Sequence, residues 1–188
     1  LIKKILNKNK KVIGIDNINS YYDTNLKKDR INNLKKSKKF SFYKIDLSNY
    51  KKLNDIVKKN KINIIIHLAA QAGVRYSIKY PRTYFKSNLE GFFNILEISK
   101  DNKIKHLIYA STSSVYGDSN KFPLKENDRT DQPLSFYAAT KKSNEVMAYS
   151  YSYIYKLPCT GVRFFTVYGP FGRPDMALFK FTKNIINN

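Results

Sequence analysis

The strongest constraint on the fold of this chain is a regular alternation of short apolar runs with helical patterns. Five runs have the composition of β-strands: Lys11–Asp16, Phe40–Leu47, Ile62–Ala70, Lys105–Ser113 and Cys159–Val167. The patterns between them are typical of helices: Leu26–Lys36, Tyr50–Asn60, Tyr84–Asn102 and Ser135–Lys156. Such alternation predicts an α/β fold with a doubly wound parallel sheet. The run Ile62–Ala70 is apolar throughout, which is typical of a strand covered on both faces.

The placement of glycine indicates that this sheet is incomplete. A Rossmann-like fold normally begins with a strand, a glycine-rich turn and a helix whose N-terminus receives a pyrophosphate. Here no glycine-rich turn precedes Lys11–Asp16, and the chain opens in what looks like the tail of that first helix. It stops on "FTKNIINN", with no obvious closing element. We therefore expect a piece of a longer protein whose sheet lacks its first strand and leaves neighbouring strands unpaired.

Charge and composition exclude some classes of protein. The 188 residues suffice for one domain with a real core, and no apolar run reaches the roughly 20 residues of a membrane span. The net charge of +21 invites a nucleic-acid interpretation. However, the lysines are spread among Asn, Ile, Tyr and Phe, which all have AT-rich codons, so we interpret them as solvated faces. The single cysteine, Cys159, excludes an internal disulfide and favours a reducing compartment, the cytoplasm.

One pair of residues suggests chemistry. Tyr137 and Lys141 stand four positions apart at the start of a predicted helix, so their side chains share a face. A free tyrosine has a pKa near 10 and is a poor base at neutral pH. In a cleft, a neighbouring ammonium would favour the phenolate and make the tyrosine a useful base.

Other polar residues follow the predicted strands, where ligands collect in open α/β sheets. They are Asp16 and Asn17, Asp46, the loop "AAQAGVR", the run Thr112, Ser113 and Ser114, and Thr166 with the residues after it. Such clustering indicates a binding site at that edge of the sheet.

Five segments together carry a family resemblance: "VIGIDNINSYYD", "HLAAQAGVRYS", "YASTSSVYG", "YAATKKSNEVMAYSY" and "RFFTVYGPFGRPDMA". In content and order they resemble the extended short-chain dehydrogenase/reductase family, and within it the nucleotide-sugar 4-epimerases, especially the UDP-glucuronate 4-epimerases. The resemblance runs over nearly the whole chain. It implies that residues 1–165 are an NAD-binding domain and that residues 166–188 begin a substrate-binding region.

The resemblance assigns catalytic roles to three residues. Tyr137 would remove the proton of the sugar 4-hydroxyl, Lys141 would favour the phenolate and hold the nicotinamide ribose, and Thr112 would hydrogen-bond the reacting oxygen. Transient oxidation at C4 by tightly bound NAD would then be reversed on the other face of the sugar.

The resemblance also implies cofactor contacts. Asp16 would bond the adenine ribose, where its carboxylate would repel a 2′-phosphate and favour NAD over NADP. The further predicted contacts to NAD come from Asn17, Asp46, Leu68, Ala69, Ala70 and Asn88. Because the glycine-rich turn is missing, we expect these 188 residues alone to bind NAD weakly or not at all.

Substrate preference is predicted from two regions. In the family that the chain resembles, dehydratases carry acidic residues after the catalytic threonine, and decarboxylating members usually carry a glutamate nearby. The run "TSSVYG" that begins at Thr112 contains no carboxylate, so the resemblance implies epimerisation and not elimination or decarboxylation. Arg173 and Thr166 match contacts to the sugar carboxylate or diphosphate, and Arg75 is a further candidate for an anion. Ser113 and Ser114 lie near the predicted substrate. The sequence therefore predicts conversion of UDP-glucuronate to UDP-galacturonate, with UDP-glucose or UDP-N-acetylglucosamine 4-epimerase, or another epimerase or dehydratase of this kind, as the alternative.

Other functions remain open at this point. The same fold can serve in dinucleotide sensing or protein binding, although Tyr137 and Lys141 are both present here. Nucleic-acid binding would show as tight, salt-sensitive association with duplex DNA. His67 and His106 are predicted to be structural, and no metal is expected. The resemblance further suggests a homodimer built from the helices Tyr84–Asn102 and Ser135–Lys156, and a role in polysaccharide biosynthesis.

Overall fold

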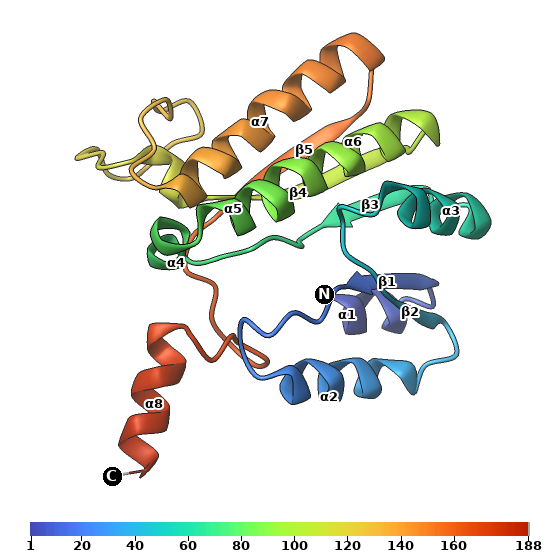
Figure 1. The fold of residues 1–188 in the computed structure, drawn as a ribbon, viewed down its shortest axis with the longest axis horizontal. Coiled ribbons are helices and arrows are strands. Elements are labelled where there is room, and N and C mark those ends of the chain that lie inside the picture. The colour runs from blue at the N-terminus through green and yellow to red at the C-terminus, as the bar shows by residue number, and fades with distance from the viewer. Residues whose placement is uncertain (188) are drawn as a thin grey trace. The chain divides into compact units, whose positions relative to one another are not determined.

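The computed structural model describes residues 1–187, which form two compact units. One comprises Leu1–Ile45 with residues 166–187, and the other comprises Asp46–Phe165. Each unit has its own parallel sheet, two-stranded in the first and three-stranded in the second (Figure 1). The predicted α/β class with parallel strands is therefore confirmed, although the strands form two hydrogen-bonded sheets instead of one. This division reflects only how densely the residues pack. The predicted boundary between a cofactor-binding domain (1–165) and a substrate-binding region (166–188) therefore stays a prediction.

The first unit is a parallel strand pair with three helices. β1 (Val12–Asp16) pairs with β2 (Phe40–Lys44). The helices are α1 (Ile2–Asn7), α2 (Thr24–Lys35) and α8 (Ala177–Asn187). A β-carbon on Gly14 would lie 2.8 Å from the Phe40 ring, so the glycine allows this aromatic side chain to pack closely against β1.

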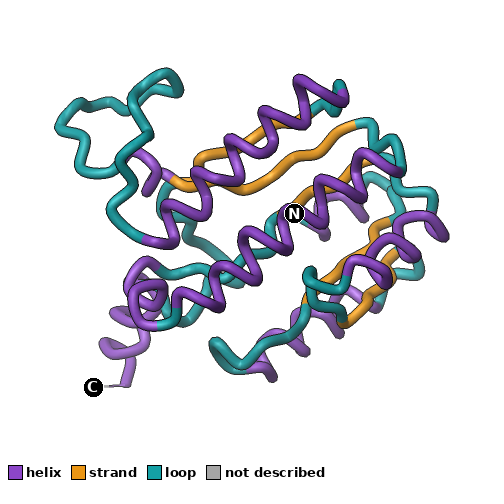
Figure 2. The backbone as a smooth tube through the Cα atoms, turned by 45° about the horizontal axis from the view of Figure 1, so that its top comes forward, coloured by secondary structure: helices purple, strands orange, loops and turns teal. Residues whose placement is uncertain are grey.

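The second unit holds the larger sheet, ordered β3-β4-β5. Its strands are β3 (Ile64–His67), β4 (His106–Thr112) and β5 (Cys159–Phe164). Its longer helices are α3 (Tyr50–Asn60), α6 (Gly91–Asp101) and α7 (Phe136–Tyr155). Figure 1 shows α6 and α7 side by side along one face of this sheet, and Figure 2 shows the same layering from a second direction. The fully buried side chains include Leu53, Tyr84, Phe92, Leu96, Ile98, Leu107 and Val115.

The segment predicted as one helix over Tyr84–Asn102 is divided in the structure. Two short helices, α4 (Val74–Lys79) and α5 (Pro81–Tyr84), lead into a π-helical turn, η1 (Phe85–Glu90), and then into α6. A π-helical turn holds one more residue than an α-helical turn and commonly occurs at functional sites. Here it carries Asn88, a predicted site residue, into the interior of the unit.

One expectation about the strands is corrected. The run Ile62–Ala70 is not covered on both faces, because Ile64 is 56% exposed and Ile66 36% exposed. Successive strand side chains point to opposite faces, and the helices cover only the face of Ile65 and His67. None of the helices in the described part of the chain combines the length and apolar character that crossing a membrane requires.

Candidate functional site

The start of α7 is anchored by hydroxyl groups. Ser135 caps the helix, since its Oγ accepts a hydrogen bond from the amide of Ala138 at 3.1 Å. The amide of Tyr137 donates to Ser77 Oγ at 3.1 Å, and Ser77 in turn donates to the carbonyl of Val74 at 2.6 Å. These bonds satisfy amides that have no partner inside the helix. The backbone that carries Tyr137 is therefore fixed to α4.

The side chains of Tyr137 and Lys141, on the same helix, differ in how deeply they are buried. Tyr137 is half-buried, and its ring meets that of Tyr84 edge-on, with centroids 6.1 Å apart. Lys141 is only 2% exposed, and this burial lowers its pKa to about 8. Because that value is still above neutrality, most of the Lys141 amine is charged at pH 7. A charged ammonium one helical turn from a phenol is the arrangement that the predicted base requires.

His67, the last residue of β3, lies close enough to Lys141 to feel its positive charge. The imidazole is fully buried beside Phe92, and its pKa is lowered to about 3 by burial first and by the positive charge of Lys141 second. His67 is therefore neutral at physiological pH. The structure agrees with its predicted structural role and places the ammonium near the carboxyl end of the sheet.

Thr112 is the last residue of β4, against which α7 packs. It is 7% exposed, and its Oγ1 accepts a hydrogen bond from the amide of Ser114 at 3.2 Å and donates one to Ser114 Oγ at 3.2 Å. Ser113 and Ser114 form the first turn of the 3-10 helix η2 (Ser113–Tyr116). The second unit thus holds all three predicted catalytic residues on elements that pack together, while their roles stay predictions.

Asn88 joins the loop after β3 to α7. Its Oδ1 accepts from the amide of Gln71 at 2.8 Å, and its Nδ2 donates to the Gln71 carbonyl at 3.0 Å and to Thr140 Oγ1 at 3.1 Å. Its own carbonyl accepts from Nδ2 of Asn144 at 2.8 Å. These contacts hold the loop that contains Ala70 against the helix that carries Lys141. Asn88 therefore braces the loop after β3 against α7, and its predicted contact to NAD stays a prediction.

The remaining candidates in the second unit lie in loops or on its surface. Asp46 stabilises a turn, since its Oδ1 accepts from the amide and hydroxyl of Ser48 at 3.0 and 2.8 Å. Leu68 is 49% exposed after β3, where Ala69 and Ala70 are half-buried. Arg75 is exposed on α4. The contacts predicted for these residues stay predictions.

The first unit carries the other candidates. Asp16 ends β1 as an exposed residue, and its Oδ1 accepts from the amide of Ile18 at 2.6 Å. Asn17 makes the same kind of turn, with Oδ1 accepting from the amide of Asn19 at 3.1 Å. Thr166 is exposed after β5. The structure therefore places the Asp16 carboxylate at the end of a parallel strand, and its contact with a ribose stays a prediction.

Arg173, predicted to bind an anion, already holds one. Its Nε and NH2 donate to the two carboxylate oxygens of Asp175 at 3.0 and 2.8 Å. The hydroxyl of Tyr21 also donates to this carboxylate, at 3.1 Å. An added phosphate or carboxylate would have to compete with Asp175 for the same fork of donors.

Several residues of this neighbourhood were not predicted: Ser77, Tyr84, Thr140, Asn144, Glu145 and Arg163. Glu145 had a signal in the sequence, since it continues the four-residue spacing of Tyr137 and Lys141. The others contact the site through residues distant in sequence.

Within residues 1–187 no group of three His, Cys, Asp or Glu side chains is arranged to hold a metal ion. Burial raises the pKa of the Cys159 thiol to about 11.

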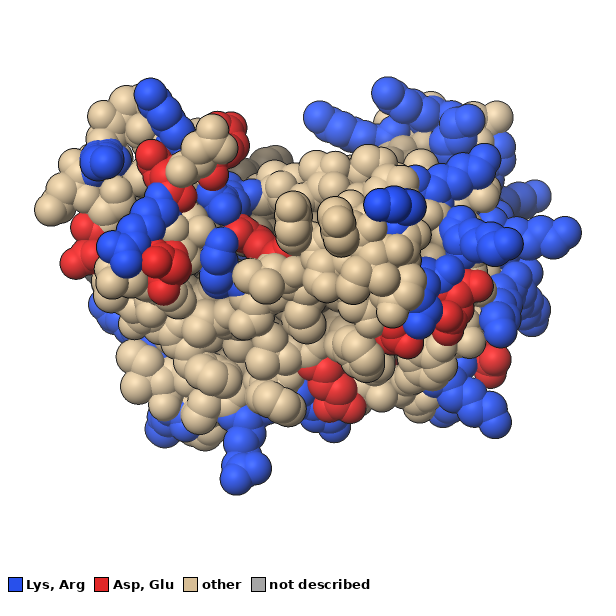
Figure 3. Space-filling model, turned by 90° about the horizontal axis from the view of Figure 1, so that it is seen from above, with Lys and Arg blue, Asp and Glu red and all other residues tan. Residues whose placement is uncertain are grey.

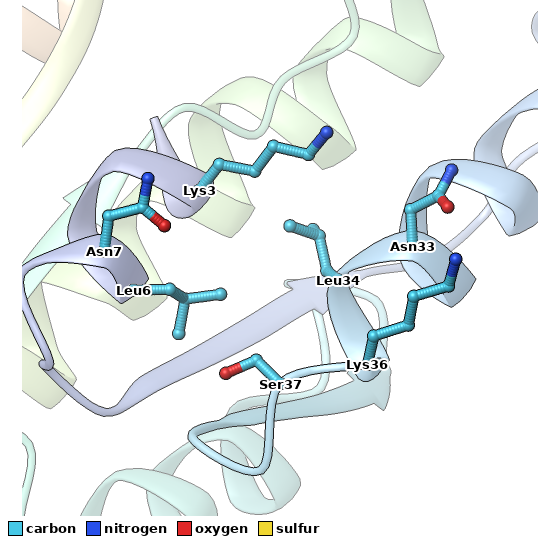
Figure 4. A pocket seen from close by; sticks show the side chains of 7 residues that line it. All are labelled: Lys3, Leu6, Asn7, Asn33, Leu34, Lys36 and Ser37. Carbon is cyan, nitrogen blue, oxygen red and sulfur yellow. The ribbon is translucent and has the colours of Figure 1, made fainter.

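The surface shows where charge and hollows lie. Basic side chains protrude at many places on the face in Figure 3, with acidic side chains among several of them. A hollow of about 390 Å³ lies between α1 and the end of α2 in the first unit (Figure 4). It is lined by Lys3, Leu6, Asn7, Asn33, Leu34, Lys36 and Ser37. No predicted site residue lines this hollow, so we attach no role in the chemistry to it.

Comparison with known proteins places the chain within one family. The family model described as GDP-mannose 4,6 dehydratase matches residues 1–188. Protein CapI of Staphylococcus aureus is 55% identical over 188 residues, which are 100% of this chain and 56% of that protein. The UDP-glucuronate 4-epimerase of Thermodesulfobacterium geofontis is 49% identical over 179 residues, 95% of this chain and 55% of that protein. The chain thus spans about half the length of the curated relatives it matches.

Solved structures are similar to this one. The crystal structure of UDP-glucuronic acid 4-epimerase from Bacillus cereus, in complex with UDP-glucuronic acid and NAD, has a TM-score of 0.92 and 34% identity. The match covers 99% of this chain and 58% of that one. UDP-N-acetylglucosamine 4-epimerase from Methanobrevibacter ruminantium M1, in complex with UDP-N-acetylmuramic acid, gives 0.87 and 32%, over 99% and 58%. These likenesses confirm the predicted Rossmann-like α/β fold.

Proposed function

The chain belongs to the GDP-mannose 4,6 dehydratase family, and from that premise we propose that the protein is an NAD-dependent nucleotide-sugar 4-epimerase that converts UDP-glucuronate to UDP-galacturonate. The observation that carries the proposal is the burial of Lys141 one helical turn after Tyr137 on α7. Similarity to UDP-glucuronate 4-epimerases supports the choice of reaction.

The residues present fit NAD in two places. The exposed carboxylate of Asp16 at the end of β1 suits the hydroxyl groups of the adenine ribose. Lys141 suits the hydroxyl groups of the nicotinamide ribose, because its ammonium is a donor held in place by burial. Small half-buried residues, Ala69 and Ala70, follow β3 and allow close approach of a cofactor to the backbone. When bound, NAD supplies the acceptor and donor of hydride for C4 of the sugar.

The protein's own side chains would handle the proton. Tyr137 would accept the proton of the 4-hydroxyl as a phenolate and return it to the same oxygen when the other epimer forms. Lys141 would stabilise the phenolate through its positive charge. Thr112 would donate a hydrogen bond to the reacting oxygen. The burial of Lys141 strengthens this electrostatic effect, since water screens a buried charge less.

The preference for a hexuronate depends on the anion ligands. Arg173, Thr166 and Arg75 are proposed to contact the sugar carboxylate or the diphosphate, and Ser113 and Ser114 the sugar. The run Thr112–Gly117 contains no carboxylate that could act as a second acid in an elimination. This supports epimerisation over dehydration, even though the family takes its description from a dehydratase.

The test uses the whole protein with NAD and UDP-glucuronate, and measures UDP-galacturonate by chromatography. We expect turnover in the wild type and a kcat lower by about 10²–10⁴-fold in Tyr137→Phe, the range for a lost general base. Undiminished turnover in this variant would remove Tyr137 from the mechanism. A panel with UDP-glucose and UDP-N-acetylglucosamine decides the substrate, because equal or higher kcat/KM for either would favour the alternative.

Three further proposals accompany this function. A homodimer built from α6 and α7 is supported by exposed apolar side chains on these helices, among them Phe93, Val146 and Tyr149. The single cysteine supports a reducing compartment, the cytoplasm. A UDP-hexuronate product suits glycosyl transfer into a polysaccharide.

A further inference from the structure

We propose that Glu145 is a positioning residue, whose carboxylate, held by Arg163 and Ser111, fixes the face of α7 that carries Tyr137 and Lys141 against the strand end that carries Thr112. The inference rests on the proposed epimerase function and assigns a further residue to it.

The Glu145 carboxylate binds two adjacent strands at once. Its Oε1 accepts from Ser111 Oγ at 2.6 Å and from Nε of Arg163 at 2.9 Å. Its Oε2 accepts from NH2 of Arg163 at 3.0 Å. Ser111 of β4 and Arg163 of β5 are directly opposite each other in the parallel ladder. The carboxylate therefore fastens α7 to a single point of the sheet, through a bidentate pair of defined geometry.

That point lies next to the predicted reacting groups. Ser111 immediately precedes Thr112 in β4. On α7, Glu145 follows Lys141 by one helical turn and Tyr137 by two, so the three side chains lie along one side of the helix. A shift of α7 along or away from β4 at Glu145 would therefore change the spacing between Tyr137 and Thr112.

Arg163 extends the connection to the segment after Thr112. Its NH1 donates to the hydroxyl of Tyr116 at 3.0 Å and to the carbonyl of Glu126 at 2.9 Å, and its guanidinium lies 4.9 Å from the centroid of the Tyr116 ring. Tyr116 closes the turn η2 that begins at Ser113. One ion pair thus joins β4, β5, α7 and the turn that follows Thr112.

The ion pair between Glu145 and Arg163 is buried enough to hold the elements that it joins in a fixed position. The side chains of Arg163 and Glu145 are 21% and 13% exposed. Burial alone would raise the pKa of the Glu145 carboxyl, but hydrogen bonds from Arg163 and Ser111 outweigh it, and the pKa is lowered. Removing one partner of such a pair leaves a buried charge uncompensated, so the loss propagates to the elements it joins. Lys142, which lies 3.4 Å from Oε2 of Glu145, is more peripheral.

The chain offers a matched control at the other end of the same helix. The Glu97 carboxylate of α6 accepts from the hydroxyl of Tyr151 on α7 at 2.6 Å and from Lys100 at 2.8 Å. It too fastens α7 to a neighbour through an ion-paired carboxylate. However, Tyr151 lies ten positions beyond Lys141, so this bond has no short path to the predicted catalytic face.

The experiment compares Glu145→Gln and Glu97→Gln in the whole protein with NAD and UDP-glucuronate, well below the melting temperature of each variant. We expect Glu145→Gln to lower kcat by at least about 10-fold with KM changed less than about threefold, because misplacement of about 1 Å can cost about 100-fold. Glu97→Gln should keep kcat within about twofold of the wild type. Glu145→Asp, which keeps the charge but shortens the side chain, should fall between them.

Each other outcome contradicts a particular statement. Equal kcat in the two glutamine variants overturns the inference, as does an effect of Glu145→Gln on KM alone. An inactive wild type overturns the proposed function and the inference with it. Should Glu145→Gln fail to fold, Ser111→Ala removes a bond to the same carboxylate without stranding a charge. An unchanged kcat in that variant then overturns the inference.

Discussion

The two units of this chain differ in how they hold their predicted functional residues. In the unit Asp46–Phe165, Thr112 and Lys141 are buried, and hydrogen bonds to Asn88, Ser77 and neighbouring groups fix the surrounding backbone. In the other unit, Phe40 is the only buried residue among those described, and Asp16 ends its strand exposed. A packed interior suits groups that must keep a geometry, whereas an exposed strand end suits groups that only contact a ligand. The difference predicts chemistry in one unit and binding in the other.

Substitutions of Lys141 and Asp16 should separate these two roles most strongly. We expect Lys141→Ala in the whole protein to lower kcat by about 10²–10⁴-fold, because the phenolate loses its stabilising charge. Asp16→Ala should weaken NAD binding about 10- to 100-fold, the effect of losing hydrogen bonds to a charged group, and leave kcat nearly unchanged at saturating NAD. Steady-state kinetics with an NAD titration measures both. Equal losses of kcat in the two variants would break the comparison.

Core truncation should separate the units in stability. Phe92 is fully buried in the second unit, so Phe92→Ala should lower the free energy of unfolding of that unit by about 3–5 kcal/mol. Phe40→Ala removes the buried side chain of the first unit and should leave the second unit unchanged. Hydrogen exchange resolved by residue measures each unit, and loss of protection around Phe92 in the Phe40 variant would contradict the division.

Acid should destabilise the second unit through His67. Its pKa is lowered from 6.5 to about 3 in the fold, so the unfolded chain binds a proton that the folded chain excludes. The contribution of His67 to the free energy of unfolding is therefore fully present above pH 6.5. It is lost as the pH falls toward 3, by at most about 1.4 kcal/mol per unit of pH. Denaturant titrations between pH 7 and pH 4 measure this slope. His67→Gln should flatten this slope, and a slope unchanged in that variant would refute the assignment.

Alkali should have the opposite and smaller effect through Lys141. Burial lowers its pKa from 10.5 to about 8, because the charged amine is less stable in the folded interior than in water. The unfolded chain binds more protons between pH 8 and 10.5, and the stability contribution of this residue rises across that range. We expect Lys141→Met to remove the rise when unfolding is followed at pH 8 and at pH 10. The exposed Lys79 provides the control, since Lys79→Met should retain it.

Local signals made much of this structure predictable. The helices at Tyr50 and Phe136 begin after the capping residues Asn49 and Ser135, and the five strands lie within the predicted apolar runs. The position of Lys141 on the same helix face as Tyr137 was predicted from their spacing alone, because four residues make about one helical turn.

What failed depended on contacts between distant residues. The exposure of Ile64 reflects which face of the sheet the helices cover, and no pattern within β3 encodes that. The pairing of Glu145 with Arg163 joins residues 18 positions apart and becomes visible only once α7 lies on the sheet.

The most direct test of the account is a crystal structure of the whole protein with NAD and UDP-glucuronate. The account predicts that Oη of Tyr137 lies within about 2.6–3.2 Å of the oxygen on C4 of the sugar, the range for proton transfer. A structure in which this oxygen faces bulk water, away from the nicotinamide and the sugar, would contradict it.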